Sequence, residues 1–135
     1  MSDNLLQLNI VTPERSMVSD KVDQVNIPGS EGDMGILYDH APILTAMRPG
    51  QLSYQKGPDT IYLVVSGGYL EVTDNRVTVL AETAEFLSEI DRDRAERARV
   101  EAESLLTNAQ TEEEFREAQK KLFRAIARLE STEKK

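Results

Sequence analysis

The spacing of apolar residues changes once along this chain, close to Ser88, and the change separates two kinds of structure. Before Ser88 apolar and polar residues alternate, as at residues 6–10 and 61–65, which is the period of half-buried strands. All five prolines and all seven glycines lie in this part, where they separate the predicted strands. We therefore expect a β-sandwich domain over residues 1–86 and a helical segment over residues 87–135.

The predicted strands join into a small antiparallel sandwich. The clearest hairpin runs from residues 69–73 back through residues 77–80, with Asp74, Asn75 and Arg76 in the turn. Asp and Asn tolerate the positive φ that tight hairpin turns require. With the helical segment that follows, the chain belongs to the α+β fold class.

The helical segment reads as an antiparallel two-helix hairpin. Asp91 stands where an N-cap is expected, and the break at residues 107–110 is followed by the capping-box sequence of residues 111–114. The connection is four residues long, and each helix is predicted at about 17 to 20 residues. Two apolar stripes recur at spacings of three and four: Ala95, Ala98, Ala102, Leu105, Leu106 and Ala109, and then Phe115, Ala118, Leu122, Ala125, Ile126 and Leu129.

The first of these stripes consists mainly of alanine, which buries little apolar surface. At about 25 cal/mol per Å² the closed hairpin is only marginally favoured, and we expect that it can open. The alternative is a hairpin that stays docked and only stabilises the domain.

Composition excludes several function classes. The chain has no cysteine and one histidine, His40, which leaves no disulfide, thiol nucleophile, zinc-finger spacing or second histidine for a catalytic triad. The net charge of -8 argues against binding a nucleic-acid backbone. No apolar run approaches the length of a membrane span, so we expect an unexported, soluble protein in a reducing cytoplasm. An independent enzyme is disfavoured.

The acidity is uneven along the chain. Residues 1–88 carry 5 Lys/Arg against 12 Asp/Glu, whereas residues 89–135 carry 11 against 12. A balanced, dense mixture of both signs is typical of a solvent-exposed helical hairpin. From these patterns alone, an adaptor that presents the charged hairpin to protein partners is the natural interpretation.

A motif in the middle of the chain carries a family resemblance. The motif residues are Gly32, Gly35, Ile36 and Leu37, then His40, Pro42, Leu44 and Thr45, closed by Pro49 and Gly50. Their order resembles the signature of the epsilon-subunit family of F-type ATP synthases, and residues 62–72 and 77–84 resemble later segments of the same family. The family often has Pro-Gly where this chain has Tyr38 and Asp39, so the turn before His40 is expected to differ in shape.

The resemblance implies a ten-stranded sandwich and a non-catalytic rotor subunit of the central stalk, which couples proton flow to ATP synthesis and inhibits ATP hydrolysis through its mobile hairpin. The implied partners are the gamma subunit, the c-ring, and the alpha and beta subunits when the hairpin is extended, at the cytoplasmic face of the bacterial inner membrane. Glu31 and Asp33 would face the c-ring and His40 the gamma subunit. Alternatively, these three are ordinary loop residues.

The resemblance also implies a regulatory ATP site on the folded hairpin. Residues 90–95 match the motif Ile/Leu-Asp-x-x-Arg-Ala that some bacterial members use for ATP. The matching residues are Glu85, Asp91, Arg94, Ala95, Arg124 and Arg128. Arginines four positions apart share one helix face and suit a phosphate chain. No phosphate loop of the form GxxxxGK[ST] is present, so the site would bind ATP without hydrolysing it.

A helical projection offers the alternative. At 100° per residue, Arg124 and Arg128 fall opposite the apolar stripe and beside Lys121, where a solvated basic face is expected. Asp91 is also explained as an N-cap, and Glu101 is acidic where a residue facing phosphate is expected to be basic.

Overall fold

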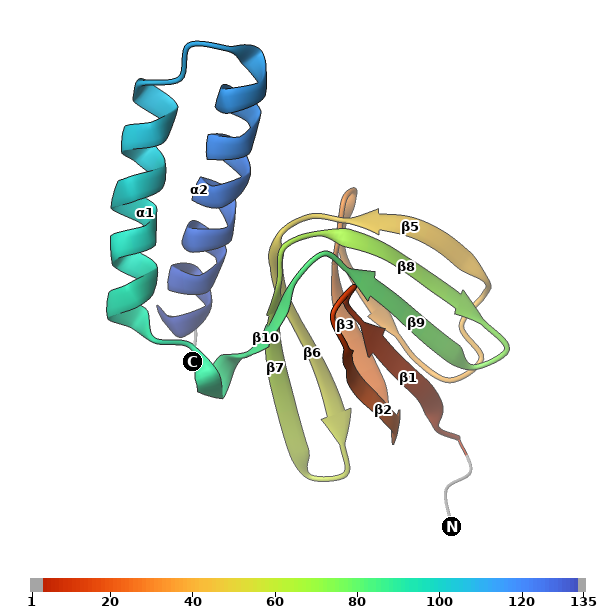
Figure 1. The fold of residues 1–135 in the computed structure, drawn as a ribbon. Coiled ribbons are helices and arrows are strands. Elements are labelled where there is room, and N and C mark those ends of the chain that lie inside the picture. The colour runs from red at the N-terminus through yellow and green to blue at the C-terminus, as the bar shows by residue number, and fades with distance from the viewer. Residues whose placement is uncertain (1–3, 134–135) are drawn as a thin grey trace.

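The computed structural model describes residues 4–133, and within that range it contains ten strands, one short 3-10 helix and two α-helices (Figure 1). The elements are β1 (Leu6–Val11), β2 (Ser16–Val22), β3 (Gln24–Gly29), β4 (Gly32–Ile36), β5 (Ile43–Met47), β6 (Gly50–Lys56), β7 (Asp59–Val65), β8 (Gly68–Thr73), β9 (Arg76–Ala81), β10 (Ala84–Phe86), η1 (Leu87–Glu89), α1 (Arg92–Thr107) and α2 (Glu112–Glu133). The predicted ten strands and two helices are confirmed. Residues 1–3 and 134–135 of the predicted segments lie outside the described residues.

The strands form one continuous, curved sheet. Its order is β10-β7-β6-β3-β5-β8-β9-β1-β2, and β4 pairs with β3 outside this path. The sheet is antiparallel except for one pair: β1 runs parallel to β9, with Leu8 opposite Val77. The all-antiparallel prediction is therefore wrong at this pair, because β1 closes the sheet next to a strand that is distant in sequence.

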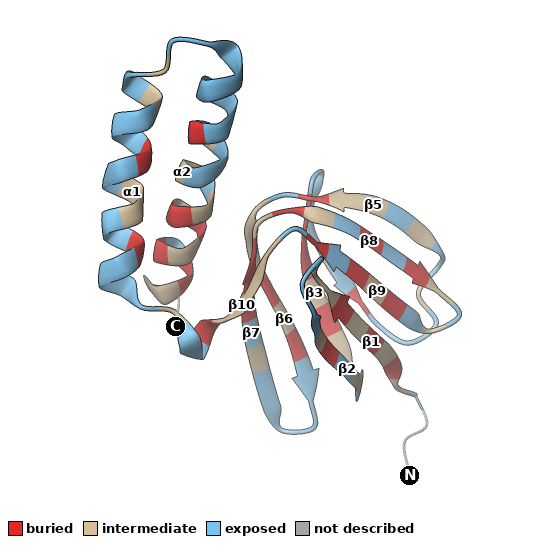
Figure 2. Ribbon diagram, in the orientation of Figure 1, coloured by how far each residue is buried: buried red, intermediate tan, exposed pale blue. Residues whose placement is uncertain are grey.

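Alternating residues of these strands fill a single core beneath the curved sheet. Leu6, Leu8 and Ile10 of β1 are completely buried, and their neighbours on the strand are half-buried. The same core cluster takes residues from every strand between β1 and β9. Figure 2 shows buried residues along the strands and far fewer on the helices. The period-two pattern thus predicted the buried face correctly.

The turn between β8 and β9 has two central residues with positive φ. Asp74 has φ 49° and Asn75 has φ 61°, the conformation of a type I′ hairpin turn. Arg76, predicted in the turn, instead begins β9. The hairpin starts at Gly68, whose φ of 135° only glycine adopts readily, and a Cβ there would lie 2.0 Å from the Leu80 carbonyl oxygen.

Both helices begin at the predicted caps. The Asp91 side chain accepts a hydrogen bond from the Arg94 backbone N–H at 3.2 Å. At α2, the Glu114 N–H donates to Thr111 Oγ1 at 3.1 Å, and the Glu114 carboxylate accepts from the Gln110 N–H rather than from that of Thr111. Helix α1 has 16 residues, slightly fewer than predicted, and α2 has 22, slightly more than predicted.

The seam between the helices is made largely of alanine. Helix α1 buries Ala95 and Ala102 of its predicted stripe, whereas Leu105, also predicted there, is 43% exposed because it lies beyond the buried part of the seam. On α2 the buried residues are Ala118, Ala125, Ala127, Leu129 and Ser131. Phe115, predicted within the second stripe, is 45% exposed.

Helix α2 has a second buried surface that the single predicted stripe did not include. Ala127 packs with Val64 of β7 and Leu87 of η1, and Ile90 packs against this group. We call Val64, Leu87, Ile90 and Ala127 the docking cluster. It holds the C-terminal half of α2 against the sandwich, while the helix connection projects away from it (Figure 1).

Candidate functional site

The docking cluster brings Glu85 and Arg128 together, although they are 43 positions apart. Glu85 lies on β10, which pairs with β7, and Arg128 follows Ala127 on α2. Arg128 Nε donates to Glu85 Oε1 at 2.5 Å, and both side chains are partly shielded, at 29% and 37% exposed. The projection that placed Arg128 on a solvated face is therefore wrong, because it considered the helix without its contact to the sandwich.

This ion pair leaves part of the Arg128 guanidinium available. Only its Nε is hydrogen-bonded to another described residue, and the two terminal nitrogens carry four further N–H donors. Arg124 lies one turn earlier on α2, is half-buried, and has no ion pair with any residue of 4–133. Two guanidiniums thus stand on one helix face, with donors free for an anionic ligand.

The other predicted ATP-site residues have structural roles at the start of α1. Asp91 caps the helix through the Arg94 N–H, and Arg94 itself is exposed. Ala95 is 3% exposed and belongs to the helix seam. Among the described residues, no hydrogen bond joins Asp91 or Arg94 to Arg124 or Arg128. The six residues therefore form two separate pairs, Glu85 with Arg128 and Asp91 with Arg94. Ala95 lies in the helix seam, and Arg124 is bonded to none of the other five.

Further along α1, Arg99 binds Glu96 and Glu103 of the same helix face. The hydrogen bond from Arg99 lowers the pKa of the Glu96 carboxyl below its usual value. These intrahelical salt bridges use part of the dense mixed charge of the segment to support the helix.

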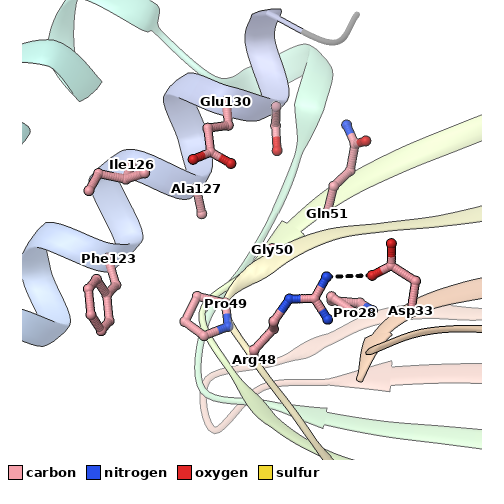
Figure 3. A pocket seen from close by; sticks show the side chains of 11 residues that line it. Pro28, Asp33, Arg48, Pro49, Gly50, Gln51, Phe123, Ile126, Ala127 and Glu130 are labelled. Carbon is pink, nitrogen blue, oxygen red and sulfur yellow. Dashed lines mark hydrogen bonds and ion pairs between the residues drawn. The ribbon is translucent and has the colours of Figure 1, made fainter. Parts of the chain in front are cut away.

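A pocket of about 350 Å³ opens beside the docking cluster, between α2 and the sandwich (Figure 3). Its lining includes Phe123, Ile126 and Glu130 from α2, and Asp33 and Arg48 from the sandwich. Sequence reasoning missed this pocket. Its residues come from three distant segments, and no local pattern connects them.

The predicted partner-binding residues lie on loops and edges of the sandwich. Glu31 is exposed in the turn between β3 and β4. Asp33 accepts from Arg48 Nη2 at 2.5 Å, and the Asp33 side chain is 81% exposed. His40 is half-buried, with its Nδ1 2.7 Å from the Ala41 carbonyl oxygen.

The turn before His40 has a positive φ at Asp39, which stands where the family often has glycine. Asp39 has φ 63°, a conformation that glycine adopts without strain. The Asp39 backbone N–H donates to Asn75 Oδ1 at 2.6 Å, and Asn75 Nδ2 donates to Asp39 Oδ1 at 3.4 Å. Asn75 of the β8–β9 turn therefore holds this loop in place.

Residues 4–133 contain no group of three or more His, Asp or Glu side chains placed to hold a metal ion. None of the described helices is long and apolar enough to cross a membrane.

Family models cover both parts of the chain. Residues 5–87 match the model described as "ATP synthase, Delta/Epsilon chain, beta-sandwich domain", and residues 88–133 match the "long alpha-helix domain" of the same chain. This chain belongs to the ATP synthase delta/epsilon family. The family's sandwich and helical domains thus meet between Leu87 and Ser88, inside η1.

Curated members of the delta/epsilon family are similar over nearly their whole length. The "ATP synthase epsilon chain" of Herpetosiphon aurantiacus is 46% identical over 125 residues, covering 93% of this chain and 92% of the relative. That of Nitratidesulfovibrio vulgaris is 45% identical over 124 residues, covering 92% of each.

Two chains from solved ATP synthase structures share the fold. A chain of the Euglena gracilis mitochondrial ATP synthase structure that contains OSCP, F1 and the c-ring matches with a TM-score of 0.81 at 24% identity. The match covers 95% of this chain and 81% of that one. A chain of the Tetrahymena thermophila central stalk and c-ring structure matches with a TM-score of 0.67 at 15% identity, covering 94% and 96%.

Proposed function

We propose that this chain is the non-catalytic epsilon subunit of a bacterial F-type ATP synthase, in which it forms part of the rotating central stalk. One observation carries the proposal: the sandwich and long-helix models of the family follow one another from residue 5 to residue 133, in a chain whose curated relatives are epsilon chains. The subunit couples proton flow to ATP synthesis through contacts rather than through chemistry of its own. It lies peripherally at the cytoplasmic face of the inner membrane.

The sandwich binds the gamma subunit and the c-ring in this proposal. Structures that contain F1 with the c-ring, or the central stalk with the c-ring, supply the chains of similar fold. Glu31 and Asp33 present exposed carboxylates at one edge of the sandwich, which suits basic ring loops. His40 lies on a separate loop, next to the turn that Asn75 holds, and contacts gamma.

The hairpin acts as a movable brake on ATP hydrolysis. Its seam buries mainly alanine, and its attachment to the sandwich depends on the small docking cluster and on one partly exposed ion pair. Both contacts are weak enough for the hairpin to leave the sandwich and reach the alpha and beta subunits.

ATP hydrolysis by the reconstituted complex tests this assignment. The complex is assembled with the full chain or with a chain that ends at Ser88, and the gamma content of each complex is measured. We expect equal assembly and faster hydrolysis without the hairpin. A fragment that fails to join gamma would contradict the subunit assignment, whereas equal hydrolysis in both complexes would contradict only the brake.

ATP is the proposed regulatory ligand of the closed hairpin. The free donors of Arg124 and Arg128 bind the phosphate chain, and Glu85 keeps Arg128 oriented through its Nε. A ligand that binds only the closed state stabilises it by about 2.7 kcal/mol at a hundredfold excess over Kd. Such a stabilisation dominates an alanine seam.

Thermal melting of the isolated full-length chain measures this effect. We expect millimolar ATP to raise the melting temperature of the unaltered chain and to leave that of Arg124→Ala/Arg128→Ala unchanged. The matched control is Arg97→Ala/Arg116→Ala, which removes two exposed arginines from the same hairpin and keeps the ATP shift. No shift in the unaltered chain, or an equal shift in both double variants, returns Arg124 and Arg128 to a purely structural role.

A further inference from the structure

The pocket between α2 and the sandwich contains one cation and two anions that come from different parts of the fold. Arg48 lies between β5 and β6, Asp33 lies on β4, and Glu130 lies on α2. Figure 3 shows Glu130 on the helix side of the pocket and the Arg48–Asp33 ion pair on the sandwich side. The three residues therefore lie where the hairpin meets the edge of the sandwich that carries Asp33.

Arg48 is anchored to the hairpin formed by β3 and β4. Its backbone N–H donates to the Pro28 carbonyl at 2.9 Å, and its Nη1 donates to the Gly29 carbonyl at 2.5 Å. Only Nη2 reaches Asp33. The backbone bond keeps Arg48 at the pocket, and its guanidinium can turn to the other side only by exchanging the Gly29 and Asp33 bonds.

The Arg48–Asp33 ion pair is weak enough to exchange. The two side chains are 45% and 81% exposed, and exposed pairs contribute little because water competes for both charges. Glu130 is exposed in the same pocket and forms no ion pair with any residue of 4–133. Among the described residues, Glu130 is thus an acid without an ion pair, and it lies on the helix that docks against the sandwich.

We propose that Arg48 couples the surroundings of Asp33 to the docking of the hairpin. When a basic partner binds Asp33, Arg48 turns across the pocket to Glu130 and adds an ion pair between α2 and the sandwich. When the hairpin leaves, Glu130 leaves with it and Arg48 returns to Asp33. This inference rests on the proposed function, because the c-ring is the partner that supplies the basic group.

Thermodynamic reciprocity makes the coupling work in both directions. Occupation of Asp33 by the ring favours the docked hairpin, and a docked hairpin releases Asp33 for the ring. The hairpin then leaves the sandwich, and so applies the brake, less readily in an assembled rotor than in the isolated subunit. The docking cluster alone would produce no such dependence, since it contains only apolar side chains.

The docked fraction of the isolated full-length chain tests the coupling without any partner. The chain has no cysteine, so spin labels on cysteines introduced at the exposed residues Thr60 and Gln110 report one distance between sandwich and hairpin. Distance distributions are recorded at a urea concentration where docked and undocked populations are comparable. Asp33→Ala mimics a partner that has taken Asp33 away from Arg48.

We expect Asp33→Ala to raise the docked-to-undocked ratio about two- to fivefold, which is the range that one exposed ion pair provides. The rise should disappear in the Glu130→Gln background and in the Arg48→Met background, where Met retains the alkyl stem. Glu14→Ala, which removes an exposed acid that has no ion pair with the described residues, should leave the ratio unchanged.

Two results would overturn the coupling: no rise with Asp33→Ala, or the same rise when Glu130 is already Gln. Either result leaves the subunit assignment intact, because that assignment is tested separately by assembly with gamma.

Discussion

Substitution of Leu87 by alanine should detach the hairpin and leave the sandwich folded. Leu87 is 6% exposed and packs with Val64 and Ala127 in the docking cluster, which is separate from the sandwich core. Buried Leu→Ala changes cost about 2–5 kcal/mol, and we expect about 2 kcal/mol because so small a cluster can collapse around the change. That free energy lowers the docked-to-undocked ratio about 30-fold.

Two optical signals separate the parts of the molecule in this experiment. All four tyrosines lie within residues 1–88 and the chain has no tryptophan, so tyrosine fluorescence follows the sandwich. Far-ultraviolet circular dichroism at the helical minimum follows the hairpin. For Leu87→Ala we expect the helical signal to melt at a lower temperature while the fluorescence transition stays in place.

The matched control is Leu80→Ala, which removes the same atoms from a side chain that is 54% exposed and should change neither transition appreciably. If Leu87→Ala lowers both transitions by the same amount, the hairpin and the sandwich unfold as one cooperative unit. The docking cluster would then not be a separate and weak attachment.

Three further outcomes follow from local geometry. Gly68→Ala should lower the unfolding free energy of the sandwich by more than about 2 kcal/mol, because the added Cβ would lie 2.0 Å from a backbone oxygen. An unchanged denaturant midpoint would contradict this. Thr111→Ala should lower the stability of the hairpin by about 1 kcal/mol, because the N-cap hydrogen bond is lost. The helical signal should therefore melt at a lower temperature than in Thr111→Ser. The hydrogen bond from Lys56 lowers the pKa of Asp20 below its usual value of 3.8. That stabilisation is present above about pH 4 and lost as the pH falls through the lowered pKa. Urea titrations should therefore show less acid destabilisation in Asp20→Asn than in the unaltered chain.

The features that the sequence predicted correctly are those set by near neighbours. The alternation of apolar and polar residues identified Leu8 and the other apolar residues of β1 as part of the core. The N-cap at Asp91 was predicted from an aspartate that directly precedes a helical pattern. The parallel β1–β9 pair was not predictable in this way, because Leu8 and Val77 are 69 positions apart and neither segment carries a signal for the other.

In the candidate site, too, contacts between distant segments were not predictable from local sequence patterns. The resemblance placed Glu85 and Arg128 in one set, and they are in contact. The projection of α2 alone assigned Arg128 to solvent, because it allowed the helix one buried stripe. Burial of Ala127 arises from a second contact, with the sandwich, that only the assembled fold contains.

The place of β1 in the sheet also fixes the order of events during protein synthesis. Strand β1 leaves the ribosome first, yet its partner β9 is about 70 residues behind it, a delay of roughly 4–14 s at bacterial translation rates of about 5–20 residues/s. Until then β1 can pair only with β2, and the two together form a hairpin that is at best marginally stable alone. The core of the sandwich therefore waits for β9, the sheet is completed by β10 at Phe86, and α2, which follows, finds its docking surface already built.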